Sequence, residues 1–257
     1  MEKDQYLLAS TYNALQVLDL LSRRERLGVA EISKALQLGK ASVFRMLYTL
    51  EKAGFVQKSE NAKYDLGVKF ALYGSLVVER LSIVQICRPF LEDLRDHFGE
   101  TAYLSILTGS GKMVFIAKQH TASSLQMYAR IGEEREAYCT ASGKAMLAFI
   151  DSAESERFAE TYEYRAHTPR TITSPGTLLE ELARVREKGY AVDREEAEIG
   201  LVCFSGPVLD HRGGCVAAMS LSGPASRMYG RQNALVDGIL RASRAVSAQL
   251  GYESRKK

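Results

Sequence analysis

The sequence predicts an α+β protein with two parts, an N-terminal winged helix-turn-helix and a larger C-terminal domain on an antiparallel sheet. In the first 70 residues, apolar positions recur at helical spacing and a short hairpin pattern follows them. From Thr101 onward, paired strand patterns and helices occur without a β-α-β rhythm, which is typical of an antiparallel sheet. We therefore expect domains over residues 1–68 and 99–257, joined by linker helices over 69–98.

The composition is that of an ordinary folded protein, with 46% apolar and 25% charged residues among 257. Neither a membrane span nor a signal peptide is expected, because no apolar run reaches 18 residues and the N-terminus lacks a basic segment before an apolar core. The four cysteines form no CxxC pair and the histidines show no metal spacing. These patterns indicate a reduced, cytoplasmic protein without a metal or cofactor.

The positive charge of the chain is concentrated near its N-terminus. Residues 1–70 hold 11 Lys and Arg against 8 Asp and Glu, which accounts for the whole net charge of +3. A basic surface of this size is a modest indication of nucleic-acid binding, because solvated lysines are common.

Three helices and a hairpin are predicted in this basic region. The helices span residues 7–22, 29–36 and 41–52, with a tight turn around Gly39 between the last two. Five apolar residues share one face of the first helix: Leu7, Ala14, Val17, Leu18 and Leu21. Residues 55–66 then read as strand, turn and strand, which is the wing of a winged helix.

The third helix carries a polar outer face opposite an apolar stripe. A helix fits the DNA major groove, and arginine can pair with a guanine edge through two hydrogen bonds. Taken singly, each of these polar residues is more typical of a solvated surface, but the ordered combination of turn, outward basic face and wing favours DNA binding. The predicted contacts are Lys40, Ala41, Ser42, Phe44, Arg45, Tyr48, Thr49, Lys52, Lys58 and Lys63, the last two on the wing.

The segment LQLGKASVFRMLYTLEKAGFV resembles the recognition segment of the IclR-type bacterial transcriptional regulators, and the likeness extends over about residues 5–250. The resemblance implies a winged helix-turn-helix joined by a helix to an effector-binding domain with a GAF-like or profilin-like fold. It also implies a homodimer or a dimer of dimers on double-stranded DNA, and two-fold proteins read near-palindromic operators.

The linker is predicted to be mostly helical. Its first helix is apolar on more than one side: Val68, Leu72, Leu76, Val77 and Leu81. Burial within the chain and packing against a partner chain explain this pattern equally well, and the resemblance favours the partner. Pro89 is expected to kink or divide the second helix, which ends at Gly99.

The C-terminal domain is predicted to alternate hairpins and helices. One hairpin spans residues 101–119, another spans 201–223, and a further strand is expected over 124–132. Helices are expected over residues 140–149, 174–190 and 226–250. In the second of these, Ser174 is the expected N-cap, Pro175 lies in the first turn and Gly189 ends the helix.

Three features predict a ligand pocket in this domain. The helix after Thr140 begins with small residues, so its free amides can approach a carboxylate. Ser220 and Ser222 alternate along one strand and face the same way, and Cys203 lies on the neighbouring strand. The resemblance places ligand contacts at Met127, Ala141, Ser142, Asp193, Cys203, Ser220 and Ser222. A small carboxylate is the expected effector.

Two charged residues near this pocket, Asp193 and Arg135, each have more than one possible role. Asp193 could contact the ligand, or it could cap a turn or hold the loop that runs to Gly200. Arg135 stands where the family often carries an apolar stretch, so it is either a surface charge or an inward cation suited to a polar, anionic ligand.

Two other functions compete with ligand-controlled regulation. Cys203, His211 and Asp193 could be drawn as a thiol triad, but an apolar strand is an ordinary packing site for cysteine. An architectural DNA-binding protein would not need so large a C-terminal domain. We expect a transcriptional regulator, with a repressor favoured over an activator, and not an enzyme.

Overall fold

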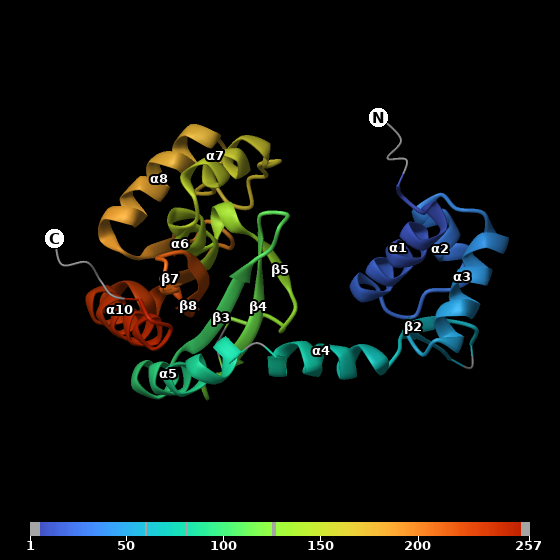
Figure 1. Ribbon diagram of the computed structural model, residues 1–257, viewed down its shortest axis with the longest axis horizontal. Helices are drawn as coiled ribbons and strands as arrows, with labels where there is room; N and C mark the ends of the chain where they lie inside the picture. Colours follow the sequence, from blue (N-terminus) through green and yellow to red (C-terminus); the bar gives the residue numbers. More distant parts are fainter. Residues whose placement is uncertain (1–5, 60, 81, 125–126, 253–257) are drawn as a thin grey trace. The chain divides into compact units, whose positions relative to one another are not determined.

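The computed structural model describes residues 6–59, 61–80, 82–124 and 127–252, and it divides the chain into two compact units, Met1–Arg80 and Leu81–Lys257 (Figure 1). The helices of the predicted linker are shared between these units. Helix α4 (Lys69–Arg80) belongs to the first unit and α5 (Ser82–Phe98) to the second. Leu81 and the side chain of Val77, both assigned to the apolar linker face, lie outside the described part of the chain.

The first unit packs three helices around an apolar core, as its sequence predicts. These are α1 (Ala9–Arg23), α2 (Val29–Leu36) and α3 (Lys40–Lys52). The stripe of α3 packs inward, with Val43 and Leu47 fully buried. Leu7 was expected on the buried face of the first helix, and this was wrong: it precedes α1 and is half exposed.

The predicted wing is confirmed as a hairpin of β1 (Val56–Lys58) and β2 (Tyr64–Leu66). The wing is fixed to the segment between α1 and α2 by backbone hydrogen bonds between Leu27 and Tyr64. The wing therefore has a defined position beside the helix-turn-helix.

The second unit is built on one six-stranded antiparallel sheet of order β5-β4-β3-β8-β7-β6. Both predicted hairpins are confirmed in it. The strands are β3 (Thr101–Leu107), β4 (Lys112–Gln119), β5 (Glu134–Glu136), β6 (Ala191–Arg194), β7 (Leu201–Leu209) and β8 (Cys215–Pro224). The unit is therefore α+β, as predicted.

Helices cover both faces of this sheet (Figure 1). One face carries α6 (Ala141–Phe149), with α7 (Ser152–Thr161) and α8 (Pro175–Lys188) packed around it. The other face carries α5 and the closing helix α10 (Gln232–Gln249). A 3-10 turn, Ala137–Cys139, leads into α6, and the short helix α9 (Ala225–Met228) and a second 3-10 turn, Tyr229–Arg231, lead into α10.

The predicted caps of α8 are present. The Ser174 hydroxyl accepts the N–H of Thr177, Pro175 is the first helical residue, and Gly189 ends the helix at φ 78°. Pro89 was expected to kink or divide the second linker helix; it does not divide it, because α5 is continuous through Pro89. The closing helix begins at Gln232 rather than at residue 226.

The strand expected over residues 124–132 is wrong for the described residues of that segment. Other groups bind its backbone in place of a sheet partner: the Tyr103 hydroxyl donates to the Met127 carbonyl and the Lys118 ammonium to the Ala129 carbonyl. The edge strand beside β4 is instead β5, where Arg135 lies opposite Met113. Within the described residues, no helix is both long and apolar enough to span a bilayer.

Candidate functional site

The outer face of α3 is open to solvent. All of its predicted DNA contacts are exposed, and Phe44 and Tyr48 are about half exposed, although aromatic side chains usually favour burial. Their rings stack at 6.5 Å, and the Lys52 ammonium lies 5.4 Å from the Tyr48 ring. The helix therefore presents cations and aromatic surface together.

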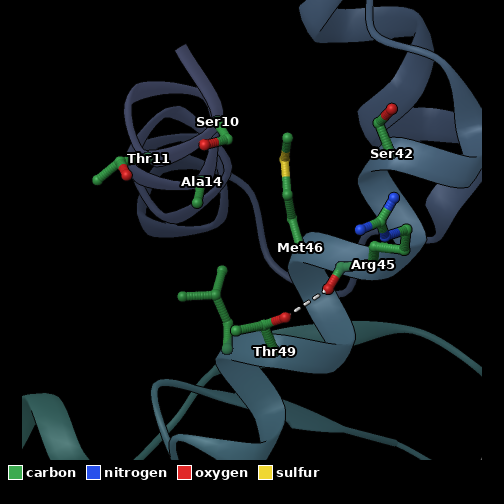
Figure 2. Close-up of a pocket in the computed structure, with 8 residues that line it drawn as sticks. Ser10, Thr11, Ala14, Ser42, Arg45, Met46 and Thr49 are labelled. Carbon is green, nitrogen blue, oxygen red and sulfur yellow. Dashed lines mark hydrogen bonds between the residues drawn. The ribbon is translucent and has the colours of Figure 1, made fainter. Parts of the chain in front are cut away.

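A groove of about 450 Å³ separates the start of α1 from α3 (Figure 2). Met46 points toward α1 across this groove, whereas the Arg45 guanidinium lies on the Ser42 side of α3. The Thr49 hydroxyl donates to the Arg45 carbonyl at 2.8 Å, so its proton is already committed. Arg45 is thus the long cationic side chain in the middle of the exposed face.

The two wing lysines differ in their surroundings. Lys63 pairs with the Glu31 carboxylate at 2.5 Å, and this hydrogen bond lowers the pKa of Glu31. Lys58 is exposed, with its ammonium 5.8 Å from the Tyr64 ring. Across the described residues, no carboxylate pairs with Lys58 or Arg45, so both are free to meet phosphate or a base.

The second unit contains a cavity against the α6 face of the sheet. All seven predicted ligand contacts line it: Met127, Ala141, Ser142, Asp193, Cys203, Ser220 and Ser222. The rest of its wall comes from Met113, Phe115, Arg135, Thr140, Ala197, Glu198 and Leu201. The cavity has a volume of about 20 Å³, which is room for about one water molecule.

The start of α6 forms one wall of the cavity. The Thr140 hydroxyl accepts the N–H of Gly143 at 3.2 Å and so caps the helix. A Cβ on Gly143 would lie 2.3 Å from backbone atoms of Ala137, so only glycine lets α6 begin this close to the preceding turn. The first N–H groups of a helix have no acceptor within it, and here those of Ala141 and Ser142 belong to buried residues at the cavity.

The hydroxyls of β8 lie on the same side of the sheet. Ser222 donates to the Cys203 sulfur at 2.9 Å, across the β7–β8 ladder. The Ser220 hydroxyl has no partner among the described residues, although the residue is 2% exposed. One hydroxyl is therefore positioned by a neighbour, and the other is available to a ligand.

The thiol triad is excluded by geometry. His211 lies in the turn after β7, eight residues along the chain from Cys203, which corresponds to roughly 25 Å of extended strand. Burial also raises the pKa of the Cys203 thiol, so it remains protonated. Within the described residues, no cluster of three His, Cys, Asp or Glu side chains could hold a metal ion.

Asp193 both lines the cavity and holds the loop that follows it. One carboxyl oxygen accepts the N–H groups of Glu196 and Ala197, at 2.7 and 3.4 Å. Burial, together with the nearby Glu196 carboxylate, raises the pKa of Asp193 to about 7. Both sequence interpretations of this residue therefore agree with its position.

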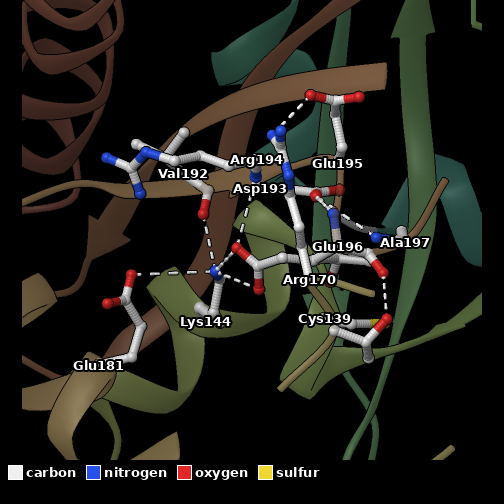
Figure 3. Close-up of polar contacts among 12 residues, drawn as sticks. Cys139, Lys144, Arg170, Glu181, Val192, Asp193, Arg194, Glu195, Glu196 and Ala197 are labelled. Carbon is white, nitrogen blue, oxygen red and sulfur yellow. Dashed lines mark hydrogen bonds and ion pairs between the residues drawn. The ribbon is translucent and has the colours of Figure 1, made fainter. Parts of the chain in front are cut away.

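The sequence analysis missed Lys144, a fully buried cation behind this wall (Figure 3). Its ammonium donates to both oxygens of Glu196, at 2.5 and 2.7 Å, and to the Val192 carbonyl at 2.7 Å. Burial raises the pKa of Glu196, while the ammonium opposes that shift. The available signal was the lysine itself, set among the small and apolar residues of TASGKAMLAF.

The loop after Asp193 is also held from outside the cavity. The Glu195 carboxylate accepts from Arg170 at 2.6 Å and from the Tyr229 hydroxyl at 3.0 Å. The hydroxyls of Thr168 and Thr171 donate to the Glu195 and Glu196 carbonyls, respectively. This loop is therefore a defined wall of the cavity.

Arg135 faces inward, in part. It lines the cavity, and its Nε is buried without a hydrogen-bond partner among the described residues. Its outer nitrogen Nη2 pairs with the Glu133 carboxylate at 2.6 Å, and the side chain is 37% exposed. One edge of the guanidinium thus faces an acid while the Nε–H remains unpaired.

Known proteins resemble this chain over nearly its whole length. Residues 10–60 match the family model "IclR helix-turn-helix domain", and residues 75–248 match "Bacterial transcriptional regulator IclR C-terminal". The HTH-type transcriptional regulator XynR of Escherichia coli K12 is 36% identical over 249 residues, 96% of this chain and 98% of XynR. The DNA-binding transcriptional repressor YiaJ of the same organism is 32% identical over 96% of this chain and 89% of YiaJ. The crystal structure of Thermotoga maritima IclR matches with a TM-score of 0.75 and 33% identity, covering 95% of this chain and 99% of that one.

Replacing Asp193 with Asn should remove a pH-dependent loss of stability. The folded protein holds the Asp193 proton more tightly than the unfolded chain, so this residue lowers the free energy of unfolding as pH rises from about 4 to about 7. Asparagine cannot ionise, and its oxygen can still accept the loop N–H groups. The melting temperature of Asp193→Asn, relative to wild type, should therefore increase between pH 5 and pH 8.

Asp210→Asn is the matched control for this measurement. The N–H groups of Arg212 and Gly214 lower the pKa of Asp210, so it stays ionised over the same range and its difference from wild type should be constant. A constant difference for Asp193→Asn as well would mean that Asp193 is already charged at pH 5.

Proposed function

Because this chain belongs to the IclR family of bacterial transcriptional regulators, we propose that it represses transcription from a near-palindromic operator under the control of a small organic acid. The family consists of DNA-binding regulators, so the chain is a regulator and not an enzyme. Repression is supported by the relative YiaJ, which is a DNA-binding transcriptional repressor. Because its DNA lies in the bacterial cytoplasm, the protein acts there.

The DNA contacts are proposed to come from α3 and the wing. The apolar stripe of α3 packs in the core of the first unit, so the opposite face of the helix is free to enter a major groove. Arg45 can pair with a guanine edge, and Phe44 offers apolar surface to a thymine methyl group. Lys58, which is exposed on the wing, is proposed to contact the phosphate backbone, and such contacts set affinity more than sequence preference.

The observation that carries the effector proposal is the gathering of all seven predicted contacts around one cavity. The N–H groups at the start of α6 can only donate, so they favour an anionic oxygen. The Ser220 hydroxyl can donate or accept, which suits a carboxylate or a hydroxyl group. A small carboxylate therefore satisfies more of this wall than an apolar ligand does.

Binding of such an acid requires the cavity wall to move. Room for one water is too small for a carboxylic acid, and the loop over residues 195–200, which connects β6 to β7, is one wall of the cavity. An effector that binds one arrangement of this wall better than the other shifts the protein toward that arrangement. Operator binding then changes if the two arrangements differ in their affinity for DNA.

A homodimer, or a dimer of dimers, is proposed from the apolar surface of the α4 segment. Four large apolar residues there are exposed: Val68, Leu72, Tyr73 and Leu76, at 83%, 56%, 43% and 39%. Exposed apolar residues grouped in this way are typical of an interaction site. A second copy of the chain would cover them and supply the second recognition helix for a two-fold operator.

Replacing Arg45 with Ala should relax base recognition. We expect a loss of about 1–3 kcal/mol of binding free energy, confined to one base position of each half-site. Lys58→Ala is the matched control, because loss of a phosphate contact should weaken all sequences alike and reduce the salt dependence. Fluorescence anisotropy on operator variants at fixed salt measures both. Equal operator affinity for Arg45→Ala and wild type would remove Arg45 from the reading face.

Replacing Leu72 with Glu should separate the protomers, because a carboxylate would be buried in the proposed interface. Sedimentation velocity at micromolar concentration should show a dimer or tetramer for wild type and smaller species for the variant. Ile131→Glu is the control, since Ile131 is 54% exposed and lies outside α4. A wild-type monomer bound to DNA one to one would overturn the dimer.

Replacing both Ser220 and Ser222 with Ala should abolish the effector response while operator binding is kept. Calorimetric screening of organic acids, followed by gel shift with any ligand found, tests this on wild type and the double variant. Ser105→Ala is the matched control, because the buried Ser105 hydroxyl has no partner among the described residues and lies outside the cavity lining. A normal response from the double variant, or binding of neutral apolar compounds alone, would contradict the carboxylate cavity.

A further inference from the structure

We propose that Arg135 binds an uncharged oxygen of the effector, so that the preferred ligand is a hydroxylated carboxylic acid rather than a simple fatty acid or a dicarboxylate. This proposal rests on the proposed function, namely that the cavity holds an acid. It adds the chemical class of that acid and the residue that selects it.

The first observation is the orphaned donor. The Arg135 side chain lines the cavity, and its Nε is buried without an acceptor among the described residues. Most buried hydrogen-bond donors in proteins are paired, and an unpaired donor destabilises the folded protein. A ligand oxygen that accepts this N–H would remove that penalty, so the site favours ligands with an acceptor at this point.

The ion pair between Glu133 and Arg135 determines which kind of ligand oxygen, charged or neutral, suits the Nε–H. The Glu133 carboxylate already lies 2.6 Å from Nη2 of the same guanidinium, and its other oxygen accepts the Arg130 N–H. The ion pair with Glu133 offsets the positive charge of Arg135. A second full anion would approach a nearly neutral pair, whereas a hydroxyl oxygen needs only the directed N–H.

The third observation is the order of polar groups across the sheet. Arg135 lies on edge strand β5, Ser220 lies on β8 in the interior of the sheet, and Asp193 lies on edge strand β6. All three residues line the same cavity, so its wall carries polar side chains from three different strands. A ligand with one carboxylate and several hydroxyls offers oxygen atoms to more than one of them.

The apolar part of the cavity wall could instead favour a fatty acid. Met113, Phe115 and Met127 line the cavity on the side of Arg135. A fatty acid could place its methylene groups against them, but it would leave the Arg135 Nε–H unpaired. The two ligand classes are therefore distinguished by what happens when that N–H is removed.

The test compares three six-carbon acids by calorimetry on the full-length protein: gluconate, hexanoate and adipate. They share a carboxylate and chain length, and they differ in carrying hydroxyls, no further polar group, or a second carboxylate. Wild type should bind gluconate most tightly. Arg135→Leu should weaken gluconate binding by about 10-fold and leave hexanoate within about 2-fold.

Two further variants separate the donor from the charge. In Arg135→Gln the amide nitrogen stands the same number of bonds from Cα as Nε, so it keeps an N–H donor without a charge, and gluconate binding should stay within about 3-fold of wild type. Glu133→Gln leaves the Arg135 charge unbalanced, and it should raise adipate affinity relative to gluconate.

The role of Arg135 and the existence of an acid-binding cavity can fail separately. If hexanoate or adipate binds more tightly than gluconate, or if Arg135→Leu binds gluconate as wild type does, the acid cavity stands and the role of Arg135 is wrong. If Ser220→Ala with Ser222→Ala binds gluconate as wild type does, the ligand lies elsewhere. If none of the three acids binds at millimolar concentration, both proposals are overturned.

Discussion

The buried ammonium of Lys144 is the contact on which the geometry of the cavity depends. It lies at the centre of α6 and joins that helix to the Val192 carbonyl and the Glu196 carboxylate (Figure 3). A buried ion pair is weak evidence for stability, since desolvation offsets much of the attraction, but loss of one partner leaves an uncompensated charge. The pair therefore holds two walls of the cavity, the start of α6 and the loop after β6, in one arrangement.

The same contact shapes the charge of the cavity. The Lys144 ammonium donates directly to the Glu196 carboxylate. At the cavity wall, Asp193 interacts with the same ammonium only through the electrostatic attraction that lowers its pKa. Burial and the nearby Glu196 carboxylate both disfavour ionisation of Asp193, whereas for Glu196 burial and the Glu181 carboxylate oppose ionisation. Asp193 is consequently only partly charged near neutral pH. This reduces the repulsion that an anionic ligand would otherwise meet at the β6 end.

Local patterns predicted most of the elements and little of the cavity. The buried stripe of α3, the caps of α8 and both hairpins follow from spacing and capping within a few residues. Residues 124–132 alternate like a strand, but the position beside β4 is taken by β5, and only the fold decides which segment pairs. The burial of Lys144 depends on Glu196, 52 residues later, so no local pattern contains it. The small-residue start of α6 and the alternation of Ser220 and Ser222 could be recognised in the sequence, but the full set of seven ligand contacts came from the family resemblance, which carries this tertiary information.

The packing of the second unit indicates how a displacement of the sheet at the cavity can be transmitted to α5. Ser220 and Ser222 alternate with Leu221, so the strand that bears the hydroxyls also packs, on its other side, against α5 and α10. A Cβ on Gly206 would lie 2.6 Å from the Ser243 hydroxyl of α10, and one on Gly238 would lie 2.4 Å from the Phe98 ring of α5. Strand β7, α10 and α5 are thus in close contact, without space between them for a side chain. Because packed interiors deform little, a displacement of the sheet has to be passed on to α5 rather than absorbed. Helix α5 follows α4 in the chain, so such a displacement reaches the element of the second unit that is nearest in sequence to the recognition helix and the wing.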